Sequence, residues 1–299
     1  IDFNSLPAPD FSDFGLDLYF FPERILPINV SSLCYWKKCV FCAEIPAIGH
    51  NIMGEEKFME IIDNYRNKFN THFVEVQSTC PSPNQMIRYM ELMDSEKIED
   101  MFFALLSRFE NLYAQKDIAK LFYRGGVRYV MWGLESGNQK ILERMQKGIN
   151  LKMVSKILSN FHQAGIKNMT YVIVGFPGET REDFQKTVNF LEINKERIDG
   201  VIITPFNLFK NSYISGHLKD FFITSVKENP DNLATYKFKA SRGLSQEESK
   251  NMITELRDRI EKGIIKISRE NQNPIDQFYL DKISGHDALH HVLFYLACK

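Results

Sequence analysis

The sequence has few cysteines, no long apolar run and no excess of charge of either sign. Its 299 residues include 5 Cys, and 37 Lys and Arg against 38 Asp and Glu give a net charge of −1. A chain this close to neutral is not expected to bind nucleic acid or anionic membranes through a broad basic surface. No apolar run reaches the roughly 18 residues of a membrane span, and the N-terminus lacks the basic and apolar regions of a signal peptide.

These absences predict a protein without a membrane partner. The small number of cysteines fits a reducing compartment better than a disulfide framework. Hydrophobic residues at 44% are enough for a globular core. We therefore expect a cytoplasmic protein. The chain begins with Ile1 and not with Met, which fits a fragment of a longer protein.

Three of the cysteines, Cys34, Cys39 and Cys42, fall within nine residues, so one short loop can direct all three at a single inorganic centre. A closed structural zinc site takes four protein ligands, whereas an iron–sulfur cluster held by three cysteines keeps one iron open. The other cysteines, Cys80 and Cys298, stand alone, and no finger-like pair of histidines lies near the loop. The spacing favours an open iron–sulfur cluster over the alternative of a zinc site.

Apolar segments alternate with amphipathic helical patterns through the middle of the chain. Apolar runs predict six strands, at 25–30, 72–76, 101–106, 127–132, 169–174 and 200–204. Apolar residues at helical spacing predict helices between them, one of which begins with a capping box of Thr180 and Asp183. Six alternations imply an α/β fold with a parallel sheet and right-handed crossovers.

The two ends of the chain lack this alternation. Residues 1–24 contain three prolines and predict an extended lead-in that docks on the core at 25–205. Residues 206–299 are expected to form a mostly helical accessory region, irregular at 207–239, with a charged helix from Ser245 and an apolar helix at 285–297. Three histidines in that last segment are interpreted as part of its amphipathic face rather than as a metal site: His286, His290 and His291.

The cysteine loop resembles that of the radical-SAM (S-adenosylmethionine) superfamily, in which an aromatic residue, here Phe41, precedes the last cysteine. In the common form of this loop three residues separate the first two cysteines, whereas in this chain four residues separate Cys34 from Cys39. Similar Cys-Tyr-Trp loops with the longer gap occur in radical-SAM enzymes with an upstream cobalamin-binding domain, including maturases of ribosomally made peptides. The resemblance implies a partial (β/α)6 TIM-like barrel and a [4Fe-4S] cluster on Cys34, Cys39 and Cys42. It also implies S-adenosyl-L-methionine (SAM), an external electron donor and, with an upstream domain, cobalamin.

Two later segments resemble SAM-binding strand ends of the same family. Gly133 to Gly137 is similar to the fourth-strand Gly-x-Glu-Ser segment, for which an ordinary tight turn is the alternative. Gly175-Phe176-Pro177-Gly178-Glu179-Thr180 is similar to the fifth-strand segment that meets the adenine. The implied SAM contacts are Phe41, Glu135, Ser136, Val174, Gly175 and Phe176.

Strands two and three end in less typical residues. Gln77 and Ser78 stand where the family often has an acidic segment, and we expect them to accept hydrogen bonds there. Arg108 is a candidate partner of the SAM carboxylate, with a solvent-facing arginine as the alternative. Cys80 follows strand two at the barrel end where active sites lie. We interpret it either as a hydrogen-atom donor, as in some peptide epimerases of the superfamily, or as a small buried hydrophobe.

The resemblance implies an enzyme that cleaves SAM reductively and modifies a C–H position, with methylation through cobalamin as one version. We expect a peptide or other extended substrate, for which aromatic residues between 206 and 238 offer a lining; simple closure of the barrel by these rings is the alternative. Two other functions stay open. One is a non-catalytic metal-binding or interaction module on the same barrel, and the other is a tRNA-modifying methylthiotransferase-like enzyme, although the charge disfavours nucleic acid.

Overall fold

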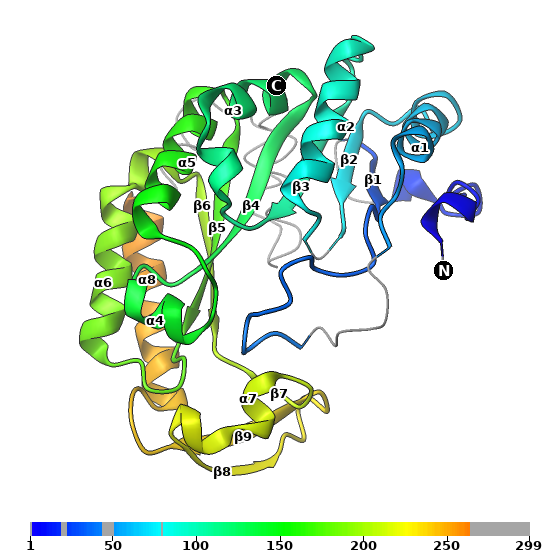
Figure 1. The fold of residues 1–299 in the computed structure, drawn as a ribbon. Helices are drawn as coiled ribbons and strands as arrows, with labels where there is room; N and C mark the ends of the chain where they lie inside the picture. Colours follow the sequence, from blue (N-terminus) through cyan, green and yellow to red (C-terminus); the bar gives the residue numbers. More distant parts are fainter. Residues whose placement is uncertain (1, 19–22, 44–50, 79, 264–299) are drawn as a thin grey trace.

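A parallel sheet of six strands forms the centre of the computed structural model, which describes residues 2–18, 23–43, 51–78 and 80–263. The strand order β1-β2-β3-β4-β5-β6 follows the chain, so each strand is hydrogen-bonded to the next. The sheet curves without pairing β1 to β6 among the described residues, which makes it an open barrel (Figure 1). The strands are β1 (Ile25–Ile28), β2 (Phe73–Val76), β3 (Phe102–Ser107), β4 (Val127–Glu135), β5 (Lys167–Val174) and β6 (Gly200–Pro205).

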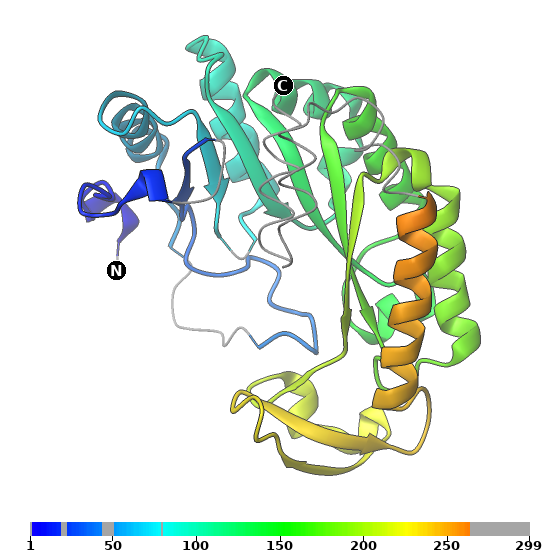
Figure 2. The ribbon, with the colours of Figure 1, turned by 180° about the vertical axis from the view of Figure 1, so that it is seen from behind.

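Helices cover the outer face of this sheet (Figures 1 and 2). The α-helices are α1 (Glu55–Asn67), α2 (Pro83–Ser95), α3 (Lys116–Arg124), α4 (Gln139–Arg144), α5 (Leu151–Gln163) and α6 (Arg181–Ile193). Short 3-10 turns lie at η1 (Phe3–Ser5), η2 (Leu16–Leu18), η3 (Asn111–Ala114) and η4 (Lys195–Arg197). The predicted alternation is confirmed. The described part of the chain contains no helix long and apolar enough to cross a membrane.

The predicted capping box at the start of α6 is also confirmed. The hydroxyl of Thr180 accepts from the backbone N–H of Asp183 at 3.2 Å, and the Asp183 carboxylate accepts from the backbone N–H of Thr180. Each bond satisfies an amide at the helix start that has no partner within the helix. The chain therefore turns sharply from β5 into α6.

Strand β4 runs three residues further than the sequence pattern predicts. Its pairing with β5 shifts between Gly133 and Glu135, which is a bulge. Glu135 has a φ of 64°, in the left-handed region that residues with a side chain rarely adopt. A glycine inside the strand hid this extension from the apolar pattern, because glycine usually weakens a strand. The bulge carries the carboxylate of Glu135 to the carboxyl end of the sheet.

A cluster of aromatic rings packs the outer face of the sheet against α3 and α5. The Trp132 ring stacks on Phe109 at 4.7 Å between centroids and meets Phe161 edge-on at 5.0 Å. Its indole N–H donates to Asn168 Oδ1 at 2.8 Å, so the ring's only polar atom is satisfied in the core. At the other end of the sheet, the ring of Phe11 in the lead-in meets the ring of Phe69 edge-on, with 5.8 Å between the centroids.

Beyond β6 the chain forms a second, smaller sheet, so the interpretation of residues 207–239 as irregular is wrong. Strands β7 (Leu208–Phe209), β8 (Ile223–Glu228) and β9 (Thr235–Ala240) pair antiparallel in the order β7-β9-β8. The short helix α7 (Tyr213–Gly216) and the 3-10 turn η5 (Leu218–Phe221) connect them. The alternation of aromatic and lysine residues in β9 is the pattern of a strand with one covered face, and the aromatic content obscured it.

The charged helix predicted after Ser245 is present as α8 (Gln246–Gly263). Figure 2 shows α8 beside β5 and β6, on the outer side of the barrel. Its Met252, Ile253 and Leu256 are buried in the same apolar cluster as the barrel strands. The division at residues 205 and 206 stays a prediction, and the helix at 285–297 with its histidines lies outside the described residues.

Candidate active site

The carboxyl ends of the strands surround a cavity of about 330 Å³. Cys34, Cys39 and Cys42 line it from the loop after β1, which crosses beneath the strand ends in Figure 1, and Cys80 lines it from the segment after β2. Leu106, Tyr171, Ile173 and Thr204 contribute the walls from β3, β5 and β6. These wall positions alternate with core positions, because successive side chains of a strand point to opposite faces.

Hydrogen bonds at both ends hold the cysteine loop. The hydroxyl of Ser78 accepts from the backbone N–H groups of Val30 and Ser31, at 2.7 and 3.0 Å, so the end of β2 positions the start of the loop. The backbone N–H of Val40 donates to the carbonyl of Met145 at 3.1 Å, which ties the far end to the residue after α4. Ser78 thus positions the cysteine loop and does not itself line the cavity.

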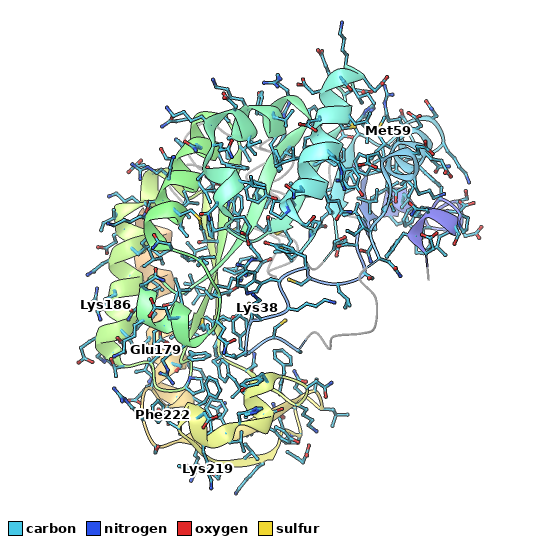
Figure 3. All side chains as sticks on the ribbon, in the orientation of Figure 1. Lys38, Met59, Glu179, Lys186, Lys219 and Phe222 are labelled. Carbon is cyan, nitrogen blue, oxygen red and sulfur yellow. The ribbon has the colours of Figure 1, made fainter. Side chains whose placement is uncertain are left out.

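Trp36 supports the middle of the loop. The guanidinium carbon of Arg108 lies 3.9 Å from the Trp36 ring centroid, and the indole N–H donates to the carbonyl of Gln146 at 3.1 Å. Lys38, labelled in Figure 3, lies over the same ring at 4.8 Å. Gly148 leaves room for the ring, since a Cβ there would come within 2.2 Å of Trp36 Cζ2.

Arg108 is buried, with 3% of its surface exposed, so the alternative of a solvent-facing arginine is wrong. Its Nε donates to Glu110 Oε1 at 2.7 Å and its Nη2 donates to the carbonyl of Lys147 at 2.8 Å. Its Nη1 is buried and has no hydrogen-bond partner among the described residues. A buried charged donor without a partner is costly, so this group suits an anionic ligand in the cavity.

Glu135 and Lys147 form a buried ion pair at the cavity wall, with 2.7 Å between Oε1 and Nζ. Burial alone would lower the pKa of Lys147, but Glu135 and the nearby Cys39 raise it above its usual value. The lysine therefore stays charged beside the cysteines. Sequence reasoning assigned no role to Lys147, although Lys147 and Gly148 follow the Gly-x-Glu-Ser segment closely in the chain.

The thiols lie in a partly desolvated setting. Burial raises the pKa of Cys39 to about 11, while Lys147 and Arg108 act in the opposite direction. The pKa of Cys80 is raised well above its usual value, mainly by a hydrogen bond with Cys34 and also by burial. Thiolates bound to iron carry negative charge, and the two cations next to them offset part of it.

Several residues implied as SAM contacts lie outside the cavity lining. The Ser136 hydroxyl bonds Thr187 on α6 at 3.1 Å and accepts from the backbone N–H of Asn138, as in the tight-turn alternative. Gly175 has a φ of 84° and donates to Glu179. Val174 and Phe176 are buried, whereas Gln77 is exposed and Phe41 lines the cavity. SAM contacts at these positions stay predictions.

The residues present fit an iron–sulfur cluster. Among the described residues, no three Cys, His, Asp or Glu side chains converge closely enough for a single metal ion. A mononuclear site needs every sulfur at about 2.3 Å from one metal, whereas a cluster of four irons accepts thiolates that are further apart. Three loop thiols and two cations line one cavity, and one of the cations, Arg108, has a buried donor without a partner among the described residues; this set meets the requirements of such a cluster and of an anionic ligand beside it.

The family model of the Radical SAM superfamily matches residues 28–191, more than half of the chain, so the chain belongs to this superfamily of enzymes. A bacteriochlorophyllide d C-12(1)-methyltransferase of Chlorobaculum tepidum is 33% identical over 210 residues, which are 68% of this chain and 45% of that protein. A tRNA-2-methylthio-N(6)-dimethylallyladenosine synthase of Methylacidiphilum infernorum is 36% identical over only 98 residues, 31% of this chain and 19% of that protein.

The fold is similar to that of TsrM of Kitasatospora setae, a radical S-adenosylmethionine methyltransferase solved with cobalamin and a [4Fe-4S] cluster bound. The TM-score is 0.68 at 10% identity, over 92% of this chain and 60% of that one. The likeness confirms the predicted partial barrel. The chain spans about half the length of the Chlorobaculum methyltransferase.

Proposed function

We propose that this chain is the catalytic barrel of a cobalamin-associated radical SAM enzyme that modifies a C–H position, by methylation, on a peptide or other extended substrate. One observation carries the catalytic part: the three loop thiols share one cavity with the unpartnered Arg108 Nη1 and the Glu135–Lys147 pair. The names of the similar methyltransferases support methylation and cobalamin.

Each group has a defined task in this proposal. Cys34, Cys39 and Cys42 hold the cluster, and Arg108 Nη1 binds the SAM carboxylate. Bound together, the cluster and SAM supply a carbon-centred radical once an external donor has delivered an electron. Glu135 accepts a hydrogen bond from SAM while its ion pair with Lys147 holds the carboxylate at the cavity wall. The apolar walls at Leu106 and Ile173 exclude water from the reacting atoms.

The substrate part rests on the surface beyond β6. Phe206 and Phe221 are buried in an apolar cluster that closes this end of the barrel, so these two rings behave as in the closure alternative. Tyr213 is 52% exposed and stacks on His217 at 3.9 Å between centroids, which leaves a rigid aromatic surface for an extended chain.

Anaerobic reconstitution with iron and sulfide tests the catalytic part. We expect a brown protein that cleaves SAM, and loss of the visible absorption in Cys34→Ala, Cys39→Ala and Cys42→Ala. Cys298→Ser, which removes a thiol far from the loop in sequence, is the matched control. A single loop variant with full iron content and SAM cleavage would disprove the ligand assignment. A colourless zinc protein would favour the non-catalytic module.

A further inference from the structure

Three separate segments of the chain hold the guanidinium of Arg108. Its carbon lies 3.9 Å from the centroid of the Trp36 ring in the cysteine loop, which fixes the plane of the group. Its Nη2 donates to the backbone carbonyl of Lys147 at 2.8 Å, and its Nε donates to Glu110 Oε1 at 2.7 Å. Because a guanidinium is planar and rigid, these contacts also fix the direction of Nη1, the buried nitrogen without a partner among the described residues.

Glu110 makes this contact in place of a local hydrogen bond. It is the N-cap residue of η3, where a side-chain oxygen often accepts from a backbone N–H at the helix start, yet its carboxylate makes no such bond within the described chain. Its Oε1 instead accepts from both Arg108 Nε and the hydroxyl of Tyr35. The side chains of Arg108 and Glu110 are 3% and 23% exposed, so water and salt screen this pair less than an ion pair on the surface.

We propose that Glu110 is a positioning residue for SAM: it holds Arg108 so that Nη1 meets the SAM carboxylate, and Tyr35 in turn holds Glu110. This inference rests on the proposed function, in which Arg108 binds that carboxylate. Tyr35 directly follows Cys34 in the chain. The network therefore connects the loop that carries the cluster ligands to the group that binds SAM.

The charge of Glu110 by itself predicts the opposite effect. A carboxylate on Arg108 repels a second carboxylate at the same guanidinium, so removing it would strengthen SAM binding if only charge mattered. Positioning predicts weaker binding, because a guanidinium released at Nε has more orientations to lose when SAM binds. The sign of the change therefore distinguishes the two effects.

The test measures SAM binding by equilibrium dialysis with the whole protein, reconstituted anaerobically and kept without a reductant so that SAM stays intact. We expect the Kd for SAM to rise about tenfold in Glu110→Ala, as for the loss of a hydrogen bond to a charged group. Glu110→Gln should lose less affinity, since its amide oxygen can still accept from Arg108 Nε. Iron content should be unchanged in both variants. Decarboxylated SAM, which lacks the carboxylate, should bind equally to the unaltered protein and to Glu110→Ala.

Glu55→Ala is the matched control, because Glu55 pairs with Arg88 Nε at 2.6 Å and neither residue lines the cavity. Unchanged or tighter SAM binding in Glu110→Ala, or an equal loss for decarboxylated SAM, would overturn the inference and leave the proposed function intact. Unaltered protein that holds a cluster but does not bind SAM would instead contradict the proposed function. If Glu110→Ala folds poorly, Glu110→Gln and Tyr35→Phe decide the question, since both are expected to bind SAM more weakly than Glu55→Ala.

Discussion

At the residue scale, Trp36 determines the shape of the cysteine loop. The loop has no helix or strand between Cys34 and Phe41, so its path depends on contacts with neighbouring segments. Trp36 is held on one side by Arg108 at 3.9 Å and on the other by Gly148, whose φ is 68°. The indole thereby connects the loop to the segment that also carries Lys147.

Gly148→Ala is expected to displace the loop. The added Cβ would lie 2.2 Å from Trp36 Cζ2, and the φ of 68° is also unfavourable for alanine. We expect a loss of about 1–3 kcal/mol in the free energy of unfolding, a shift of tryptophan fluorescence and a lower iron content after reconstitution. Gly216→Ala is the control, because a Cβ there meets nothing within 4 Å. Equal iron content and stability in the two variants would contradict the role of Trp36.

At the element scale, the turn from β5 into α6 depends on one buried carboxyl group. Glu179 Oε2 accepts from the backbone N–H of Gly175 at 2.6 Å, and the Glu179 carbonyl accepts from the N–H of Leu244 at 2.8 Å. The residue thus joins the turn to the start of α8. Figure 3 shows Glu179 near Phe222, where the barrel meets the three-stranded sheet. Burial raises the pKa of Glu179 to about 8.

This raised pKa predicts that the protein becomes less stable as the pH rises. In the unfolded chain the pKa of this carboxyl lies near its ordinary value of 4.5, while in the folded protein the group stays protonated up to about pH 8, so the folded state binds more protons between these values. The contribution of Glu179 is complete below the unfolded value and is lost as the pH rises through about 8.

Glu179→Gln is expected to remove this pH dependence. Chemical unfolding at several pH values between 5 and 9 should therefore show a smaller loss of stability in this variant than in the unaltered protein. Glu182→Gln changes an exposed carboxylate nearby and serves as the control. If the variant and the unaltered protein lose stability in parallel, Glu179 is not the group responsible.

At the scale of the whole molecule, α8 is part of the barrel's outer layer. It follows the small sheet in sequence, yet its apolar face is buried in the main core with the strands. Leu256→Ala should cost about 2–5 kcal/mol, as for other buried leucines. Glu255→Ala, at an exposed position, is the control. Because α8 shares one core with the strands, denaturant unfolding of Leu256→Ala should show a single transition. Two transitions would indicate that α8 unfolds separately.

The net charge of the chain favours a peptide over tRNA as the expected partner. A charge of −1 provides little neutralisation of phosphates, so we expect tRNA binding to be weak and to disappear with added salt. Peptides encoded beside the gene are expected to bind with little dependence on salt. Binding of both ligands would be measured across a range of salt concentrations. Tight tRNA binding with a steep salt slope, and none to any peptide, would favour the methylthiotransferase-like alternative.

Sequence alone determined the class of fold and predicted an iron–sulfur centre. The six strands follow from apolar periodicity, because a strand covered on both faces has to be apolar along its length. The three cysteines could be assigned together because their chemistry depends on short spacing within one loop. The capping box of Thr180 and Asp183 is likewise local, so it could be read directly.

Only the tertiary structure decided which distant residues complete the site. Lys147 pairs with Glu135, and Arg108 stacks on Trp36. In each case two segments of the chain approach each other, and no local sequence pattern predicts that approach. The same holds for Cys80, which looks isolated in the sequence and lies beside Cys34 in the fold. The bulge in β4 and the burial of Ser136 against α6 arise from packing between elements. Such contacts depend on the whole barrel, because the curved sheet brings the strand ends together.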